Sequence, residues 1–254
     1  MSTPKMPETG LETPPDRKPA RAARMNPEAR REQLVEQAAE FFSENGFDAG
    51  TRQLASQLGV TQPLIYRYFK SKEDLINEVY RMVYVGQWQD EWTSRLRDRS
   101  LPMQDRLIAF YRSYCPAIFN RRWMRIFFFA ALKGLDINAR YVARVAKRIL
   151  HPIADEMRAE LGIDSAAPIT RTEEELVWLM HGAVFYQGIR EHVYRTVDDM
   201  DYDFGLRMAV DLYLVKARDL VARAVANAED GKPDPSLVHP PCQATRKPPS
   251  RPWQ

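Results

Sequence analysis

Residues 50–72 carry the side chains of this chain that are best suited to binding a charged partner. The stretch reads GTRQLASQLGVTQPLIYRYFKSK and contains no acidic residue. Its basic residues are Arg52, Arg67, Lys70 and Lys72. The segment before it instead repeats glutamate at every fourth position from Glu28 to Glu44. Because phosphate attracts cations and repels carboxylates, we expect residues 50–72 to face nucleic acid and the glutamates to face away from it.

The apolar periodicity predicts that this stretch forms two short helices joined by a tight turn. The helices are predicted over 51–58 and 61–69, with Gly59 in the turn and Thr61 as the cap of the second helix. This arrangement is a helix-turn-helix, whose second helix enters the major groove of DNA. Four apolar residues at helical spacing are predicted to form its core: Leu54, Leu58, Ile65 and Phe69.

Helical periodicity also dominates the rest of the chain, so the predicted fold class is all-α. Asn26 predicts the start of a first helix and Gly46 its end, while Ser71 predicts the start of a long fourth helix. Pro116 and Pro152 are expected to kink the helices that contain them. The remaining helices are predicted near 101–119, 122–134, 138–161, 172–194 and 203–227.

These elements divide the chain into four predicted segments. Residues 1–25 and 229–254 are rich in proline and poor in bulky apolar side chains, so they are expected to be disordered tails. Residues 26–72 are expected to form an N-terminal three-helix domain that contains the helix-turn-helix. Residues 73–228 are expected to form a C-terminal helical domain around a core of their own.

The composition favours a soluble cytoplasmic protein. Hydrophobic residues make up 44% and charged residues 28% of the 254 residues, and no apolar run is long enough for a signal segment or a membrane span. The two cysteines and four histidines are dispersed, so the sequence predicts no metal site and no disulfide framework. No nucleophile or phosphate-binding motif is present, so we expect neither an enzyme nor a bound cofactor.

Residues 27–80 resemble the DNA-binding domain of the TetR family of transcriptional regulators. The resemblance is carried by residue types at fixed spacings: Phe41, Gly46, Thr51, Leu54, Ala55, Leu58, Gly59, Val60, Tyr66, Phe69, Lys72 and Leu75. It implies a homodimer that binds a palindromic double-stranded DNA operator, usually as a repressor. It also implies that the C-terminal domain dimerises and binds a small-molecule effector that releases the DNA.

The resemblance assigns DNA-contacting roles position by position. Thr51, Tyr66 and Lys72 would bind backbone phosphates, which fix the register on DNA. Arg52 would reach a base edge, for which guanine suits the guanidinium group, and Gln62 would read adenine. Five further residues complete the predicted DNA site: Thr61, Pro63, Leu64, Arg67 and Tyr68.

Aromatic residues are dense from 110 to 129, and Trp88 and Trp92 stand four residues apart on the predicted fourth helix. Aromatic residues at helical spacing are typical of a packed core, whereas the resemblance implies an effector pocket among the middle helices. The candidates for a pocket lining are Trp88, Trp92, Tyr111, Cys115, Trp123, Phe127 and Phe185. Such a lining would favour an apolar or aromatic effector.

The last two predicted helices are apolar on more than one face. Because a monomer would leave that surface exposed, we expect a second subunit to cover it, with Val184 and Leu212 at the interface. The resemblance likewise implies a four-helix bundle between subunits. Two functions remain open: a ligand-responsive repressor, and a DNA-binding protein of the same fold that is architectural or controlled by a protein partner.

Overall fold

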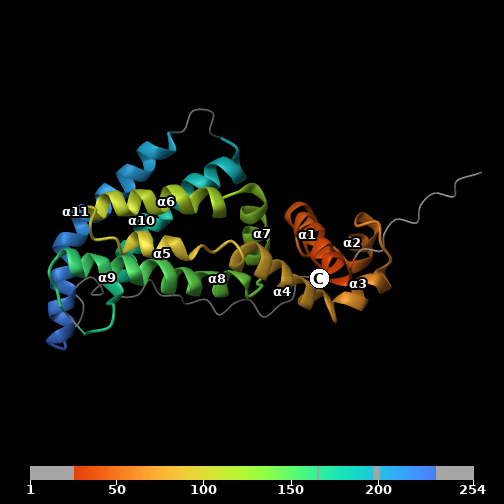
Figure 1. The fold of residues 1–254 in the computed structure, drawn as a ribbon, viewed down its shortest axis with the longest axis horizontal. Helices are drawn as coiled ribbons and strands as arrows, with labels where there is room; N and C mark the ends of the chain where they lie inside the picture. Colours follow the sequence, from red (N-terminus) through yellow and green to blue (C-terminus); the bar gives the residue numbers. More distant parts are fainter. Residues whose placement is uncertain (1–25, 165, 197–200, 233–254) are drawn as a thin grey trace, which may run out of the picture.

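A computed structural model describes residues 26–164, 166–196 and 201–232, and within these ranges the chain is helical and forms no strand (Figure 1). The all-α prediction is therefore confirmed. The predicted tail 1–25 and all but the first four residues of the predicted tail 229–254 lie outside the described residues. No helix in the described ranges is both long and apolar enough to cross a membrane.

Three helices form the N-terminal unit at one end of the molecule (Figure 1): α1 (Pro27–Asn45), α2 (Thr51–Gln57) and α3 (Gln62–Tyr68). Asn26 caps α1 by accepting a hydrogen bond from the backbone N–H of Glu28. Gly59 has a φ of 62°, a left-handed conformation that gives the tight turn between α2 and α3. Leu54, Ile65 and Phe69 are buried and Leu58 is partly buried, so the predicted core is confirmed.

The fourth helix is shorter than predicted. Helix α4 (Lys72–Tyr80) continues as a π-helical segment, Arg81–Val85, and the chain then leaves the helix before α5 (Asp90–Leu96). The backbone N–H of Gly86 closes the π-helical segment on the Arg81 carbonyl at 2.8 Å. Because glycine is a poor helix former, the continuous helix ends there. Trp88 consequently lies in the break and only Trp92 is helical, so their predicted place on one helix is wrong.

The C-terminal helices are α6 (Met103–Ile118), α7 (Arg121–Leu132), α8 (Ile137–Val145), α9 (His151–Glu160), α10 (Arg171–Ile189) and α11 (Tyr202–Glu229). A π-helical segment, Ala146–Leu150, joins α8 to α9, and Pro152 is the second residue of α9. This wider turn suits a residue that lacks a backbone N–H. Helices α10 and α11 pack along each other, and α7 lies between the C-terminal helices and α1 (Figure 1).

Two buried ion pairs hold the far end of the C-terminal helices together. Arg106 on α6 donates to Glu156 on α9 at 2.7 Å, and Arg158 on α9 donates to Glu173 on α10 at 2.6 Å. All four residues are buried, so each pair fixes the relative position of two helices.

Candidate DNA interface and adjoining cavity

Half of the ten predicted DNA contacts are exposed to solvent on the helix-turn-helix of α2 and α3. Tyr66 on α3 is 45% exposed, and the other exposed members are Arg52, Thr61, Pro63 and Arg67. Thr51, Gln62, Leu64, Tyr68 and Lys72 are partly buried. Thr61 precedes α3 at the cap position, but its side chain makes no capping hydrogen bond. Its hydroxyl group is therefore available to an external partner.

A side-chain network ties the start of α2 to α3. Gln62 Nε2 donates to Thr51 Oγ1 at 2.8 Å, and Thr51 Oγ1 also shares a 3.2 Å hydrogen bond with the Tyr66 hydroxyl. Three of the predicted DNA contacts thus hold one another in place. A base or phosphate that recruits Gln62 or Tyr66 would exchange a hydrogen bond within this network for one to DNA.

Lys72 lies closer to the protein backbone than the sequence suggests. Its ammonium group donates to the carbonyl oxygens of Phe47 at 2.5 Å and Ala49 at 2.8 Å, which belong to the loop between α1 and α2. An ammonium group has three N–H donors, so one remains for a phosphate. Lys72 therefore fixes the loop that leads into the helix-turn-helix, and its predicted phosphate contact stays a prediction.

Basic side chains of α7 contact the acidic face of α1. Arg122 pairs with Glu36 and Arg121 with Glu44, and the Arg121 guanidinium lowers the pKa of the Glu44 carboxyl. Arg125 donates from Nε to the Ser43 carbonyl at 2.5 Å. We call this contact surface the α1–α7 interface. It uses two of the glutamates that the sequence predicts to face away from DNA.

A close backbone approach continues the α1–α7 interface beyond the end of α1. Gly46 has a φ of 70°, and a Cβ atom at that position would lie 3.3 Å from the Phe129 ring. Lys133, just after α7, pairs with Asp48 in the following loop. The C-terminal helices are thus joined to the N-terminal unit by ion pairs and by packing.

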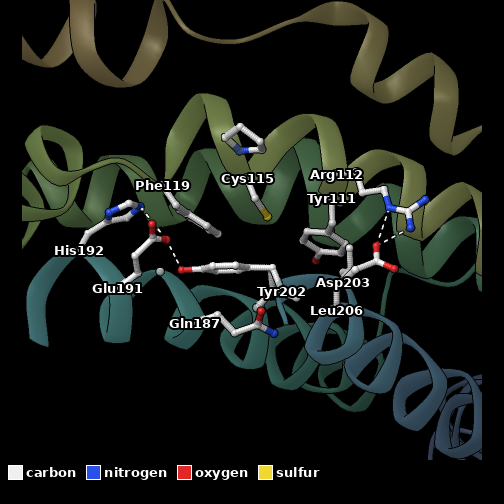
Figure 2. A pocket seen from close by; sticks show the side chains of 13 residues that line it. Tyr111, Arg112, Cys115, Phe119, Gln187, Glu191, His192, Tyr202, Asp203 and Leu206 are labelled. Atoms are coloured by element: carbon white, nitrogen blue, oxygen red, sulfur yellow. Dashed lines mark hydrogen bonds and ion pairs between the residues drawn. The ribbon is translucent and has the colours of Figure 1, made fainter. Parts of the chain in front are cut away.

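A cavity of about 420 Å³ lies between α6, the end of α10 and the start of α11 (Figure 2). Its apolar lining consists of Tyr111, Cys115, Pro116, Phe119, Val184, Gly188 and Leu206. Its polar lining consists of Arg112, Gln187, Glu191, His192, Tyr202 and Asp203. Burial raises the pKa of the Cys115 thiol to about 12, so the thiol is protonated at neutral pH.

Polar contacts connect α11 across this cavity to α6 and to a π-helical segment, Arg190–Tyr194, that continues α10. Arg112 Nε on α6 donates to Asp203 Oδ1 at 2.7 Å, and Arg207 Nε donates to Asp203 Oδ2 at 2.7 Å. These two guanidinium groups lower the pKa of Asp203. On the other side, the Tyr202 hydroxyl donates to Glu191 (Figure 2). The start of α11 is thereby held on both sides of the cavity.

Two of the seven predicted pocket residues, Tyr111 and Cys115, line this cavity. Trp123, Phe127 and Phe185 instead pack together beside it, with the Trp123 and Phe127 rings stacked 5.0 Å apart. Trp88 and Trp92 form a separate edge-to-face pair with ring centroids 5.2 Å apart. Trp92 is fully buried and its indole N–H donates to Ser113 Oγ at 3.0 Å.

The sequence interpretation missed the polar half of the lining. It selected mainly aromatic residues of the middle helices, whereas the polar residues other than Arg112 come from the end of α10, the segment after it and the start of α11. Two glycines in these apolar helices were the available signal. A Cβ at Gly188 would lie 2.7 Å from Met124 Cε, and a Cβ at Gly205 would lie 2.5 Å from Gln187 Nε2. Glycine in a helix interior often marks such a close approach.

The cavity floor rests on a buried histidine. The Tyr111 hydroxyl and His181 Nδ1 are in hydrogen-bond contact at 3.2 Å. Burial lowers the pKa of His181 to about 4, so its ring is neutral at physiological pH. Within the described ranges, no three His, Cys, Asp or Glu side chains are grouped so that they could hold a metal ion.

Comparison with known proteins places the N-terminal unit among bacterial regulators. Residues 34–79 match the family described as "Bacterial regulatory proteins, tetR family". A segment of 56 residues is 39% identical to the HTH-type transcriptional repressor KstR2 of Mycolicibacterium smegmatis. That match covers 22% of this chain and 27% of the repressor, so the chain spans about a quarter of the length of this curated relative.

Solved structures extend the likeness to the whole fold. A TetR-family protein from Mesorhizobium loti superposes with a TM-score of 0.53 at 14% identity, covering 76% of this chain and 98% of that protein. A TetR-family transcriptional regulator from Streptomyces coelicolor also superposes with a TM-score of 0.53, at 18% identity, covering 82% of this chain and 87% of the other. At these identities the likeness shows a common fold.

Proposed function

We propose that this chain, whose residues 34–79 match the TetR family of transcriptional regulators, is a repressor that binds a palindromic operator as a homodimer and is released by a small molecule. The observation that carries this proposal is the exposed face of α2 and α3, where polar and basic side chains gather on a packed helix-turn-helix. Arg52, Thr61 and Arg67 are exposed there without acidic neighbours in residues 50–72. Such a face suits the phosphates and base edges of the major groove.

Exposed apolar side chains on α10 and α11 support the dimer. They include Leu179, Tyr186, Phe204, Met208, Leu212 and Val215. Leu212 is 62% exposed, which suits its predicted place at an interface. Val184 is only 4% exposed and lines the cavity, so its predicted interface position is wrong. On an α-helix, residues 184 and 186 lie on different faces, and here Tyr186 is on the outer one.

The cavity supports control by a small molecule, because its volume lies within the range of ligand sites. We place the path to DNA through α7. Phe119 lines the cavity beside the start of α7, and the other end of the path is the α1–α7 interface. A ligand that moves Phe119 would move α7 and, through its arginines, α1. Trp88 and Trp92, on which the sequence hypothesis based the switch, do not line this cavity.

Selection of binding sites from a random duplex library tests the DNA-binding part of the proposal. We expect the wild-type protein to enrich an inverted repeat whose half-sites are about one helical turn apart or a multiple of it. Arg52→Ala should relax the preference at one base pair of each half-site and cost about 1–3 kcal/mol there. Lys70→Ala is the matched control, because this basic residue of the same stretch has no predicted base contact, so its loss should leave the preferred sequence unchanged. Enrichment of no common sequence by the wild type would contradict the proposal.

A further inference from the structure

The polar groups around the cavity differ in whether they already have partners. Every charged group at its rim is in contact with another polar group. Arg112 is bound to Asp203, which also binds Arg207. Glu191 accepts a hydrogen bond from the Tyr202 hydroxyl, and His192 Nε2 lies 3.4 Å from the Glu191 carboxylate. A charged ligand would therefore share its countercharge with the partner that each of these groups already has, and would gain less from it than from a free ion.

Gln187 is different, because its carboxamide has no hydrogen-bond partner among the described residues. It lies beside Tyr202 on the α10 side of the cavity (Figure 2). Gly205 leaves the space that the Gln187 carboxamide occupies, since a Cβ there would approach Nε2 to 2.5 Å. A carboxamide offers both donors and an acceptor, so a single ligand hydroxyl or carbonyl group can bind it.

The rest of the cavity offers little else to a polar ligand. Its floor is formed by Tyr111, Cys115 and Phe119, and the Tyr111 hydroxyl is already engaged with His181. The Cys115 sulfur points into the cavity as a protonated thiol, which is a weak hydrogen-bond partner (Figure 2). An apolar ligand body would match this floor.

We infer that the cavity selects an uncharged, largely apolar molecule that carries one hydroxyl or carbonyl group, which Gln187 binds. The inference rests on the proposed function, since it names the class of effector for the proposed effector site. We infer an uncharged ligand because the charged groups at the rim already have polar partners, and a ligand charge that is buried without a free partner is strongly disfavoured. We infer one hydroxyl or carbonyl group on the ligand because a ligand that lacks such a group would leave the Gln187 carboxamide without a hydrogen bond.

Four biphenyls of similar size test the inference by isothermal titration calorimetry on the full-length protein without DNA. They are 4-methylbiphenyl, biphenyl-4-methanol, biphenyl-4-carboxylate and biphenyl-4-methylammonium. We expect the alcohol to bind about fivefold more tightly than the hydrocarbon, and both charged compounds to bind at least about a hundredfold more weakly than the alcohol. In Gln187→Met, which keeps the side-chain length, the alcohol should bind no better than the hydrocarbon. In Cys115→Phe, which fills the cavity, all four should lose binding.

The opposite results would overturn the inference. Tight binding of the carboxylate would mean that Arg112 serves as its countercharge despite the contact with Asp203, and tight binding of the ammonium would mean that the rim carboxylates do the same despite their own partners. An advantage of the alcohol that persists in Gln187→Met would remove Gln187 as the anchor, and no binding of any compound would remove the cavity as a ligand site. Operator affinity is measured separately. An alcohol that binds as expected but leaves operator affinity unchanged would contradict ligand-controlled repression while the class of ligand stands.

Discussion

Lys72 shows how one side chain can serve both the protein and its partner. Its two hydrogen bonds to the Phe47 and Ala49 carbonyls hold the loop before α2, and a third donor remains free. The sequence predicts a phosphate contact from the position of Lys72 at the start of a helix. The structure adds a positioning role that no local pattern indicates, because the carbonyl partners lie more than twenty residues earlier in the chain.

Lys72→Ala should therefore affect both folding and DNA binding. We expect the free energy of unfolding to fall by about 2 kcal/mol, since two charge-assisted hydrogen bonds are lost. Operator and random DNA should both bind more weakly, with the slope of log affinity against log salt flattened by about one unit. Lys70→Ala is the control, because the exposed Lys70 side chain holds no carbonyl. Equal stability of the two variants in urea unfolding would contradict the positioning role.

His181 should make stability depend on pH in a defined window. Its pKa falls from 6.5 to about 4 on burial, so the unfolded chain binds more protons than the folded protein between these values. The free energy of unfolding should thus decrease as the pH falls from 6.5 to 4, by about 3 kcal/mol from this residue. His181→Gln does not titrate and should lose that much less over the same window. Parallel pH profiles of the two proteins in urea unfolding would refute the assignment.

At the scale of elements, helix type and order are predictable because each helix carries its own periodicity and caps. The fourth helix is the exception: its apolar pattern runs through Gly86, yet the chain closes a π-helical segment there and restarts at Asp90. Trp88 and Trp92 still touch, although not as residues of one helix. Their contact spans the break before α5, whereas the sequence placed both residues on one face of a single helix.

The residues that line the cavity also fall into those that the sequence could predict and those that it could not. Tyr111 and Cys115 were predictable because they lie on the inner face of one apolar helix. Gln187 and Asp203 were not, since they reach the cavity only after the end of α10 and the start of α11 pack beside α6. Which faces of distant helices meet is set by the packing of the whole core, for which the sequence offers only indirect signs such as Gly205.

A charge swap in the α1–α7 interface tests whether α7 positions α1. Glu36→Arg places two cations together and should lower the free energy of unfolding by about 1 kcal/mol, because the native pair is partly exposed. It should also weaken operator binding. Adding Arg122→Glu restores an ion pair with reversed polarity, so operator affinity should recover in the double variant.

Arg171→Glu is the control for this swap. It disrupts a more exposed pair, with Glu175 on α10, outside the α1–α7 interface, and operator affinity should not change. Failure of the double variant to recover operator affinity would show that α7 does not act on α1 through these charges. Thermal unfolding of each variant separates a loss of folded protein from a loss of coupling.

At the scale of the whole molecule, the distribution of exposed apolar residues is uneven. Several lie on the outer faces of α10 and α11, among them Leu179, Leu212 and Val215, whereas α7 contributes Leu132 at its end. A second, smaller hollow of about 220 Å³ between α10 and α11 is lined by Leu176, Leu179, Ala183 and Leu212 among others. A concave apolar face on two adjacent helices is the shape expected of one half of a four-helix bundle. A two-fold axis through it would present two recognition helices to successive major grooves.

Leu212→Glu should therefore abolish the dimer and, with it, tight operator binding. A carboxylate buried in an apolar interface without a partner should raise the dimer dissociation constant at least about a hundredfold. Leu132→Glu is the matched control, because Leu132 is the more exposed of the two, at 86% against 62%, and lies on α7.

If the exposure of the leucine alone governs the effect, Leu132→Glu will weaken the dimer as much as Leu212→Glu. If the α10–α11 face is the interface, only Leu212→Glu will sediment as a monomer at micromolar concentration, and only it will lose operator affinity while single half-site binding persists. A wild-type protein that sediments as a monomer at that concentration would refute the dimer.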